Sequence, residues 1–119
     1  MWIVSTTGFF SVVASTKKNE VMVRARKRSD LVALQKRFGD RRKILRTPKN
    51  DYLYRIYLPL SVWSHWLSDL AMDSADYPNF KHAVKRQNVQ RASTYSKVWD
   101  VCREIETEDG RRPSTGWRV

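Results

Sequence analysis

Three residues of one segment have the side chains of a hydrolase triad. Ser61, His65 and Asp69 follow one another at intervals of four residues, a spacing that places them on one side of a helix. Such an enzyme also needs donors that stabilise an oxyanion and a turn that exposes the nucleophile, and the sequence indicates neither. Because the trio lies opposite the tryptophans of the same segment, we interpret it as a solvated polar face.

The remaining candidate ligands are scattered along the chain. His82, Cys102, Asp73 and Asp76 do not have the spacing of a zinc site. The single cysteine excludes a disulfide within the chain, and the four glycines are isolated rather than gathered in a phosphate-binding loop. We therefore expect no metal and no cofactor. We favour a protein that is not an enzyme over a nuclease site built from Arg, Tyr and His.

Charge is the strongest functional signal. The 119 residues carry a formal net charge of +11. Residues 17–49 hold 13 of the 23 Lys and Arg but three of the 12 Asp and Glu, so this block carries +10 and the rest about +1. A concentrated basic block is typical of proteins with an anionic partner, most often nucleic acid. A surface that is basic only for solubility is the alternative.

The size and hydropathy of the chain indicate a small intracellular protein. We expect one α+β domain over residues 1–106 and a disordered tail over residues 107–119. No run of residues is long and apolar enough for a membrane helix, and the first 15 residues lack the basic start of a signal peptide. The expected location is the cytoplasm, with no membrane partner.

Alternating apolar residues predict the strands. Segments 2–5 and 9–14 indicate one strand with a glycine bulge, which we favour, or two short strands. The same period-two pattern predicts further strands at 21–26, 43–47 and 52–58. Pro59 should end the last of these because it has no N–H to donate.

Apolar residues at helical spacing predict two helices that follow strands. The first has the stripe Leu31, Leu34 and Phe38, with a cap at Ser29 or Asp30 and closure at Gly39. The second should be capped by Ser61. Its apolar face comprises Val62, Trp63, Trp66, Leu67 and Leu70.

Two further helices are expected near the C-terminus, at about 80–87 and 92–106. The second has the predicted stripe Tyr95, Val98, Trp99, Cys102 and Ile105. Asp69, Asp73 and Asp76 are interpreted as an acidic helix end. This patch can contact basic residues of a second copy, so a homodimer is one expected assembly.

The order of elements predicts two ββα units, which align at an offset of 31 residues with Arg24 matching Arg55. Duplication and convergence both explain this match. The units should form a four-stranded, mainly antiparallel sheet with helices on one face, a permuted ferredoxin-like sandwich, followed by the C-terminal helices.

The face of this sheet away from the helices is the predicted functional surface. It should carry Met22, Arg24, Arg26, Leu53, Arg55 and Tyr57, and Arg46 and either Phe9 or Phe10 could join it from the other two strands. Aromatic rings stack on bases, and guanidinium groups pair with phosphate oxygens. The alternatives are that the last helix covers this face or that the sheet is part of an oligomer.

Several short motifs together resemble a known group of proteins. They are MWIV (1–4), GFFS (8–11), MVRAR (22–26), PLSVW (59–63) and NFK (79–81). Over residues 1–105 the chain is similar to a family of short uncharacterised bacterial and phage proteins. That family has no assigned activity, so the resemblance implies a bacterial or phage origin and transfers no site residues.

The sequence thus predicts a small non-enzymatic protein that binds RNA or DNA. The expected nucleic-acid-binding residues are Arg24, Arg26, Lys27, Arg28, Arg41, Arg42, Lys43, Arg46, Arg55 and Tyr57. The alternative is a protein-interaction module, an adaptor or a phage-encoded inhibitor of a host machine. Such a module would bind its partner through the same surface, or through Trp117 and the acidic helix.

Overall fold

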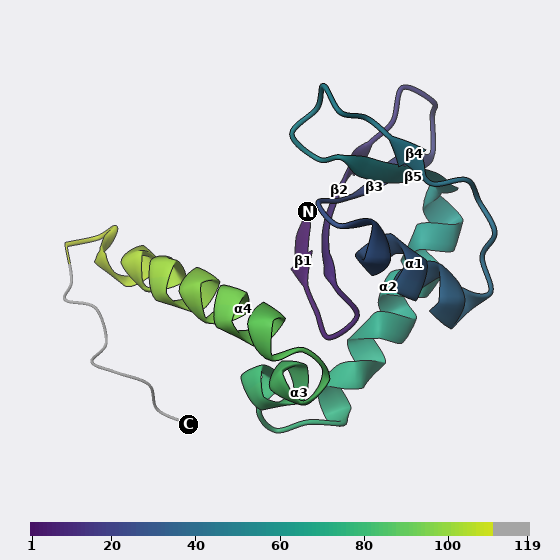
Figure 1. Cartoon of the computed structure of the whole chain (residues 1–119). Coiled ribbons are helices and arrows are strands. Elements are labelled where there is room, and N and C mark those ends of the chain that lie inside the picture. The colour runs from purple at the N-terminus through teal and green to yellow at the C-terminus, as the bar shows by residue number, and fades with distance from the viewer. Residues whose placement is uncertain (111–119) are drawn as a thin grey trace. The chain divides into compact units, whose positions relative to one another are not determined.

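The computed structural model describes residues 1–110. Trp117 and the rest of the expected tail beyond Gly110 lie outside the described residues. The chain divides into two compact units, residues 1–76 and the residues from Tyr77 onward, and each is described by itself (Figure 1). That residues 1–106 behave as a single domain stays a prediction.

The first unit contains a five-stranded antiparallel sheet in the order β1-β2-β3-β5-β4. Its strands are β1 (Trp2–Val4), β2 (Phe9–Ala14), β3 (Glu20–Ala25), β4 (Leu45–Arg46) and β5 (Tyr54–Pro59). The α+β class and the antiparallel pairing are confirmed. The expected number of four strands is wrong.

The additional strand arises at Gly8, where the favoured bulge is in fact a turn between two strands. The Ser5 amide donates to the Gly8 carbonyl (3.0 Å), and the Gly8 amide donates to the Ser5 hydroxyl (3.1 Å). These bonds reverse the chain, and β1 pairs antiparallel with β2. A Cβ on Gly8 would lie 2.7 Å from Cγ of Asp30, so the turn also needs a glycine because a helix approaches it closely.

The loop before β5 is longer than expected. β4 covers two residues and β5 starts at Tyr54, whereas the sequence predicted strands at 43–47 and 52–58. The Thr47 amide donates to the Leu53 carbonyl (2.6 Å) and its hydroxyl donates to the Tyr52 carbonyl (3.0 Å). These bonds hold Tyr52 and Leu53 in the loop rather than in the ladder.

Helix α1 (Arg28–Phe38) ends at Gly39, as predicted. Gly39 has φ 62° and donates its amide to carbonyls of the last turn, a left-handed cap that suits glycine. The predicted start is wrong: Lys27 is the cap residue. The Asp30 carboxylate instead accepts a bond from the Phe9 amide (3.1 Å), which links α1 to β2.

Helix α2 (Leu60–Met72) continues into a short 3-10 turn, η1 (Asp73–Ala75). Pro59, not Ser61, is its cap residue, and no side chain caps the helix. The Leu60 amide donates to the Asn19 carbonyl (2.7 Å). A tertiary backbone bond from the β2–β3 turn therefore replaces the capping bond expected from Ser61.

Helices α1 and α2 pack on the same face of the sheet. The core combines the apolar stripes of both helices with one face of β2, β3 and β5, as the alternation predicted. Its buried members are Phe10, Val12, Val23, Ala25, Leu31, Leu34, Ile56, Leu58, Trp63, Trp66 and Leu70. The Phe38 and Trp66 rings stack with their centroids 4.8 Å apart and join the two helices.

An ion pair also joins α1 to α2. The Arg37 guanidinium binds the carboxylates of Asp69 (3.0 Å) and Asp73 (2.7 Å). These hydrogen bonds raise the pKa of Arg37 above its ordinary value, against the opposing effect of desolvation. Two of the three aspartates expected to meet a second copy therefore bind a basic residue of their own chain.

The second unit is a pair of helices, α3 (Phe80–Gln87) and α4 (Val89–Cys102), followed by a 3-10 segment, η2 (Arg103–Thr107). Asn88 ends α3 and caps α4 by accepting the Arg91 amide (2.9 Å), where the sequence predicted a longer linker. The Phe80 and Tyr95 rings stack at 5.8 Å. Ala83, Val84, Ala92 and Tyr95 are buried.

The predicted stripe of α4 is buried in part. Tyr95 is buried and Trp99 half-buried, whereas Val98, Cys102 and Ile105 are exposed. Because α4 is 14 residues long and α3 only eight, the shorter helix can cover little more than its first half. Within residues 1–110, no helix has the length and apolarity needed to cross a membrane.

Candidate nucleic-acid interface

We call the side of the sheet away from α1 and α2 the outer face. Directly opposed residues of paired strands point to the same side, so the register traces rows of side chains across it. One row crosses the whole sheet and contains Trp2, Ser11, Arg24, Arg55 and Leu45. A second row contains Val13, Met22 and Tyr57. Val4 and Phe9 form a third.

The register decides which phenylalanine lies on this face and whether Arg46 does. Phe10 is fully buried in the core, so Phe9 is the phenylalanine on the outer face. Arg46 lies opposite Tyr54, a residue packed against the core. The expected placement of Arg46 on the outer face is therefore wrong, although its side chain is exposed.

Arg24 and Arg26 lie over one aromatic ring. Their guanidinium carbons are 4.7 Å and 4.5 Å from the ring centroid of Tyr52, within cation–π range. Arg24 also donates to the Ser11 hydroxyl (2.7 Å), and Arg26 donates to the Asp51 carbonyl (3.0 Å). Tyr52 is 4 % exposed. The loop before β5 thus places a buried ring where it orients two arginines.

Arg55 is buried, which differs from its expected place on an open surface. Its side chain donates from Nε to the Thr47 hydroxyl (3.2 Å) and approaches the Met22 sulfur with Nη1 (3.4 Å). It is 7 % exposed. Tyr57, two residues further on, is 38 % exposed, as a surface residue of this face should be.

Three aromatic rings contact one another in series on the outer face, with Phe9 between Trp2 and Tyr52. The Trp2 and Phe9 ring centroids are 6.4 Å apart in an edge arrangement, and the Phe9 and Tyr52 centroids are also 6.4 Å apart. None of the three is among the predicted binding residues. The sequence signal was the two-strand interpretation of residues 2–14, because the hairpin register is what brings Trp2 to this face.

The other predicted basic residues lie in two connections. Lys27 and Arg28 are exposed at the start of α1, and Arg41, Arg42 and Lys43 are exposed in the segment between α1 and β4. Arg42 forms an ion pair with Asp40. Gln35 donates to the Asp40 carboxylate (3.0 Å) and to the Arg42 carbonyl (2.6 Å), so this segment is anchored to α1.

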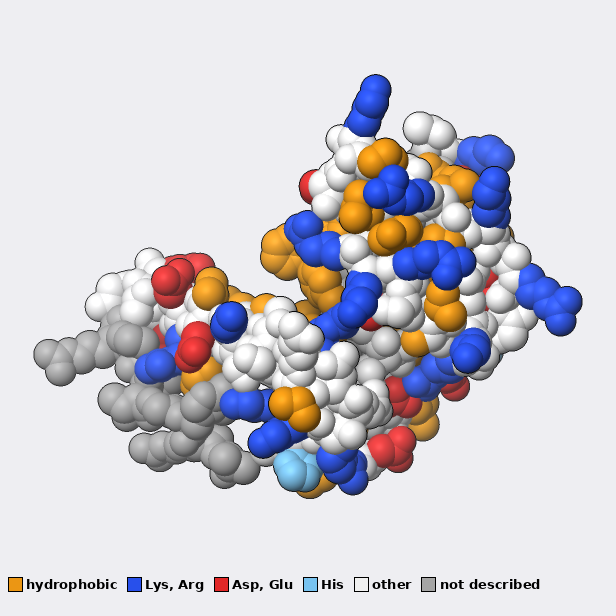
Figure 2. Space-filling model, viewed as in Figure 1, with side chains coloured by type: hydrophobic (Ala, Val, Ile, Leu, Met, Phe, Trp, Pro, Cys, Tyr) orange, Lys and Arg blue, Asp and Glu red, His pale blue; other side chains and the backbone are white. Residues whose placement is uncertain are grey.

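The outer face has cations without carboxylate partners. Arg37 and Arg42 bind carboxylates, whereas Arg24, Arg26 and Arg55 form no ion pair with any of residues 1–110. Figure 2 shows Lys and Arg side chains interleaved with hydrophobic ones over the first unit. Charged groups next to apolar and aromatic surface are the features that bind nucleic acid in other proteins.

The geometry supports neither the hydrolase trio nor a metal site. Ser61, His65 and Asp69 are all exposed, and Asp69 binds Arg37. Over the part of the chain that the structure describes, no group of three or more His, Cys, Asp or Glu residues could hold a metal ion.

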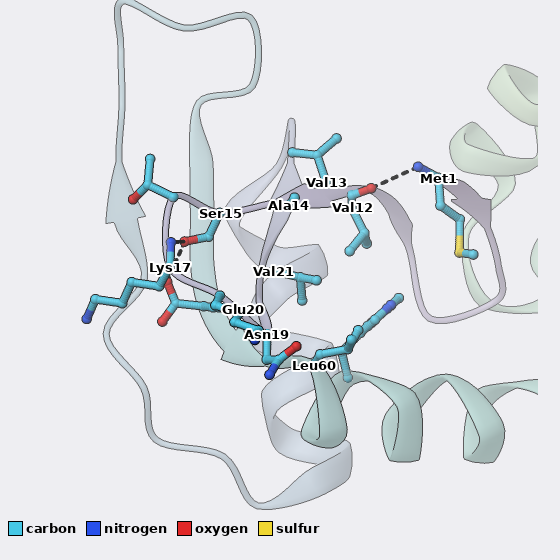
Figure 3. Close-up of a pocket in the computed structure, with 13 residues that line it drawn as sticks. Met1, Val12, Val13, Ala14, Ser15, Lys17, Asn19, Glu20, Val21 and Leu60 are labelled. Atoms are coloured by element: carbon cyan, nitrogen blue, oxygen red, sulfur yellow. Dashed lines mark hydrogen bonds between the residues drawn. The ribbon is translucent and has the colours of Figure 1, made fainter.

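A depression of about 610 Å³ lies between Met1, the β2–β3 hairpin and the start of α2 (Figure 3). Its one carboxylate, Glu20, accepts a hydrogen bond from the Ser15 hydroxyl (2.5 Å). Val12, Val21 and Trp63 line its apolar part, and Lys17 and Lys18 line it as well.

Comparison of the chain with models of protein families, with curated protein sequences and with solved structures finds no match. The resemblance to short bacterial and phage proteins therefore stays a prediction.

Proposed function

We propose that this chain is a small non-enzymatic protein that binds nucleic acid on the outer face of its sheet. Arg24, Arg26 and Tyr57 would contact the ligand there. Lys27, Arg28, Arg41, Arg42 and Lys43 would hold phosphates at the rim. The first unit is, in this proposal, a permuted ferredoxin-like sandwich that β1 extends. The support is the order β2-β3-β5-β4, with one helix after β3 and one after β5.

The observation that carries the proposal is the pairing of Arg24 with Arg55. The two arginines stand directly opposite each other in the ladder, and like charges in that position destabilise a sheet. No carboxylate of residues 1–110 binds either of them, and Arg26 adds a third cation beside Arg24. A bound phosphate would relieve this repulsion.

The roles of the arginines differ in this proposal. Arg24 and Arg26 are held over Tyr52, so fewer rotamers are lost when they bind a phosphate. Arg55 is buried, and we assign it the role of raising the positive potential beneath the surface. Arg46 would contribute from the edge of the sheet rather than from its face.

The test is binding of fluorescent RNA and DNA, single-stranded and double-stranded, over a range of salt concentrations. The double variant Arg24→Gln/Arg26→Gln should bind more weakly and show a salt slope reduced by about 0.7–0.9 for each phosphate that is no longer neutralised. Lys36→Gln is the matched control, because Lys36 is an exposed cation of α1 and lies away from the outer face. Its affinity should change little.

Absence of binding to all four ligands at low salt would refute the proposal. A partner captured equally well after nuclease treatment would then favour the protein-interaction module. Turnover of labelled RNA that is abolished by His65→Ala or His82→Ala would instead show an enzyme.

A further inference from the structure

We infer that the nucleic acid bound by the outer face is single-stranded, and that Trp2 stacks on an unpaired base. This inference rests on the proposed function and names the class of its ligand. It is carried by the positions and the exposure of the aromatic residues on that face.

Trp2 offers a large aromatic surface in a fixed place. It is 75 % exposed, and its row on the outer face includes Arg24. Bonds on both sides of Met1 anchor its backbone: the terminal amino group donates to the Val12 carbonyl (2.8 Å), and the Val12 amide donates to the Met1 carbonyl (2.8 Å). The neighbouring Phe9 ring restricts the indole further, so little entropy is lost when a base stacks on it.

Tyr57 provides a second exposed ring on the same face. It lies on β5, whereas Trp2 lies on β1, and β2 and β3 separate them. Three strand spacings of about 4.8 Å place β1 and β5 roughly 14 Å apart, and Tyr57 lies one row along the strands from the row of Trp2. Arg24 lies on β3, between these two strands. Taken strand by strand, the outer face therefore has an aromatic side chain on β1, a cationic one on β3 and an aromatic one on β5, the last in the neighbouring row.

The Tyr52 ring is not available for stacking on a base. Tyr52 is buried, with the guanidinium groups of Arg24 and Arg26 lying over it. Phe9 is half-buried between Trp2 and Tyr52. The exposed rings of the outer face are thus Trp2 and Tyr57, while Tyr52 orients the cations.

This arrangement suits an unpaired strand better than a duplex. In a duplex the faces of the bases are stacked on one another, and only phosphates and groove edges are accessible. A single strand exposes both its bases and its phosphates, so it can use the aromatic and cationic positions together. A surface intended only for duplex phosphates would gain nothing from an exposed indole.

The experiment compares a 12-nucleotide single strand with the matched 12-base-pair duplex, as RNA and as DNA, using the full chain. Wild type should prefer the single strand. Trp2→Ala should weaken its binding roughly 5- to 150-fold, the range expected when one base no longer stacks, while the salt slope is unchanged because every phosphate remains neutralised. Trp2→Phe should retain most of the affinity.

Two readouts separate stacking from a structural effect. Ligand should quench the tryptophan fluorescence of wild type but quench Trp2→Phe much less, even though Trp2→Phe still binds. Met72→Ala is the control for loss of an exposed apolar side chain, since Met72 is 69 % exposed on α2, and it should bind like wild type. Circular dichroism and thermal unfolding establish that each variant is folded.

Equal or tighter binding of the duplex would overturn the inference. So would a Trp2→Ala variant that binds the single strand like wild type, while Arg24→Gln/Arg26→Gln does not. In both results the proposed function survives, because nucleic acid is still bound through the arginines. Absence of binding to any nucleic acid overturns both.

Discussion

The two faces of strands β3 and β5 are built from alternate residues of the same segments, yet they differ in burial and in charge. On the inner face, Val23, Ala25, Ile56 and Leu58 are fully buried under α1 and α2. On the outer face, Arg24 and Arg55 lie opposite each other, and no carboxylate of residues 1–110 binds either of them. The inner face is optimised for burial. The outer face retains charge at positions where apolar residues would stabilise the sheet more, which is typical of a binding surface.

The largest effect should come from the inner face. Ile56→Ala is expected to lower the free energy of unfolding by about 2–5 kcal/mol, because it removes buried methyl and methylene groups and leaves a cavity. Tyr57→Ala, one residue further on and on the outer face, should cost about 1 kcal/mol or less. Urea unfolding measures both. Similar losses for the two variants would show that the outer face is as structural as the inner one.

A second substitution should stabilise the protein, whereas most substitutions destabilise it. Arg55→Met is expected to raise the free energy of unfolding by roughly 1 kcal/mol, because it replaces a buried cation that no carboxylate of the described residues binds by an apolar side chain of similar length. It also removes the repulsion with Arg24. Thr47 keeps its hydroxyl bond to the Tyr52 carbonyl, so the loop stays anchored.

Nucleic-acid affinity of Arg55→Met should fall at the same time, since the positive potential of the face is reduced. Urea unfolding measures the expected gain in stability of Arg55→Met, and anisotropy titration of the same preparation measures the expected loss of affinity. A clear loss of stability would mean that Arg55 is retained for structure, and the contrast between the faces would fail at this residue.

The smallest effect should come from an arginine that is already neutralised. Arg37 binds Asp69 and Asp73 at a partly exposed site, so Arg37→Gln should cost at most about 1 kcal/mol. Its raised pKa adds stability that is lost only when the pH rises above the ordinary arginine value, so salt is the variable to change. The cost of the substitution should shrink as salt is raised.

Nucleic-acid binding should be unaffected by Arg37→Gln, in contrast to the variants of Arg24 and Arg26. Anisotropy at constant salt measures this. Weakened binding comparable to that of Arg24→Gln/Arg26→Gln would show that total charge, rather than the outer face, determines affinity.

Local patterns predicted the inner face well. The apolar residues that alternate in β3 and β5, and those that form the stripes of α1 and α2, pack in the core. Burial of one side of an element leaves its period in the sequence. Gly39 was predicted as a helix end because a left-handed residue is best provided by glycine. The predicted helix caps at Ser29, Asp30 and Ser61 were wrong. The Asp30 carboxylate accepts the Phe9 amide instead, and the first amide of α2 donates to the Asn19 carbonyl.

The outer face was predicted in outline and missed in detail. Arg24, Met22 and Tyr57 were placed on it correctly by alternation. Trp2 was missed because its face depends on the register of a hairpin that was not favoured. Tyr52 was assigned to a strand, whereas it lies in a loop and packs against Arg24 and Arg26.

The sequence by itself therefore determined the class of fold, the buried sides of its main strands and helices, and the concentration of positive charge in residues 17–49. Each of these follows from the type and local period of neighbouring residues. Only the tertiary structure decided that Trp2 joins the row of Arg24, that Tyr52 orients two arginines, and that Arg55 is buried while Arg37 is neutralised. These depend on strand register and on contacts between residues distant in sequence, which leave no period in the chain.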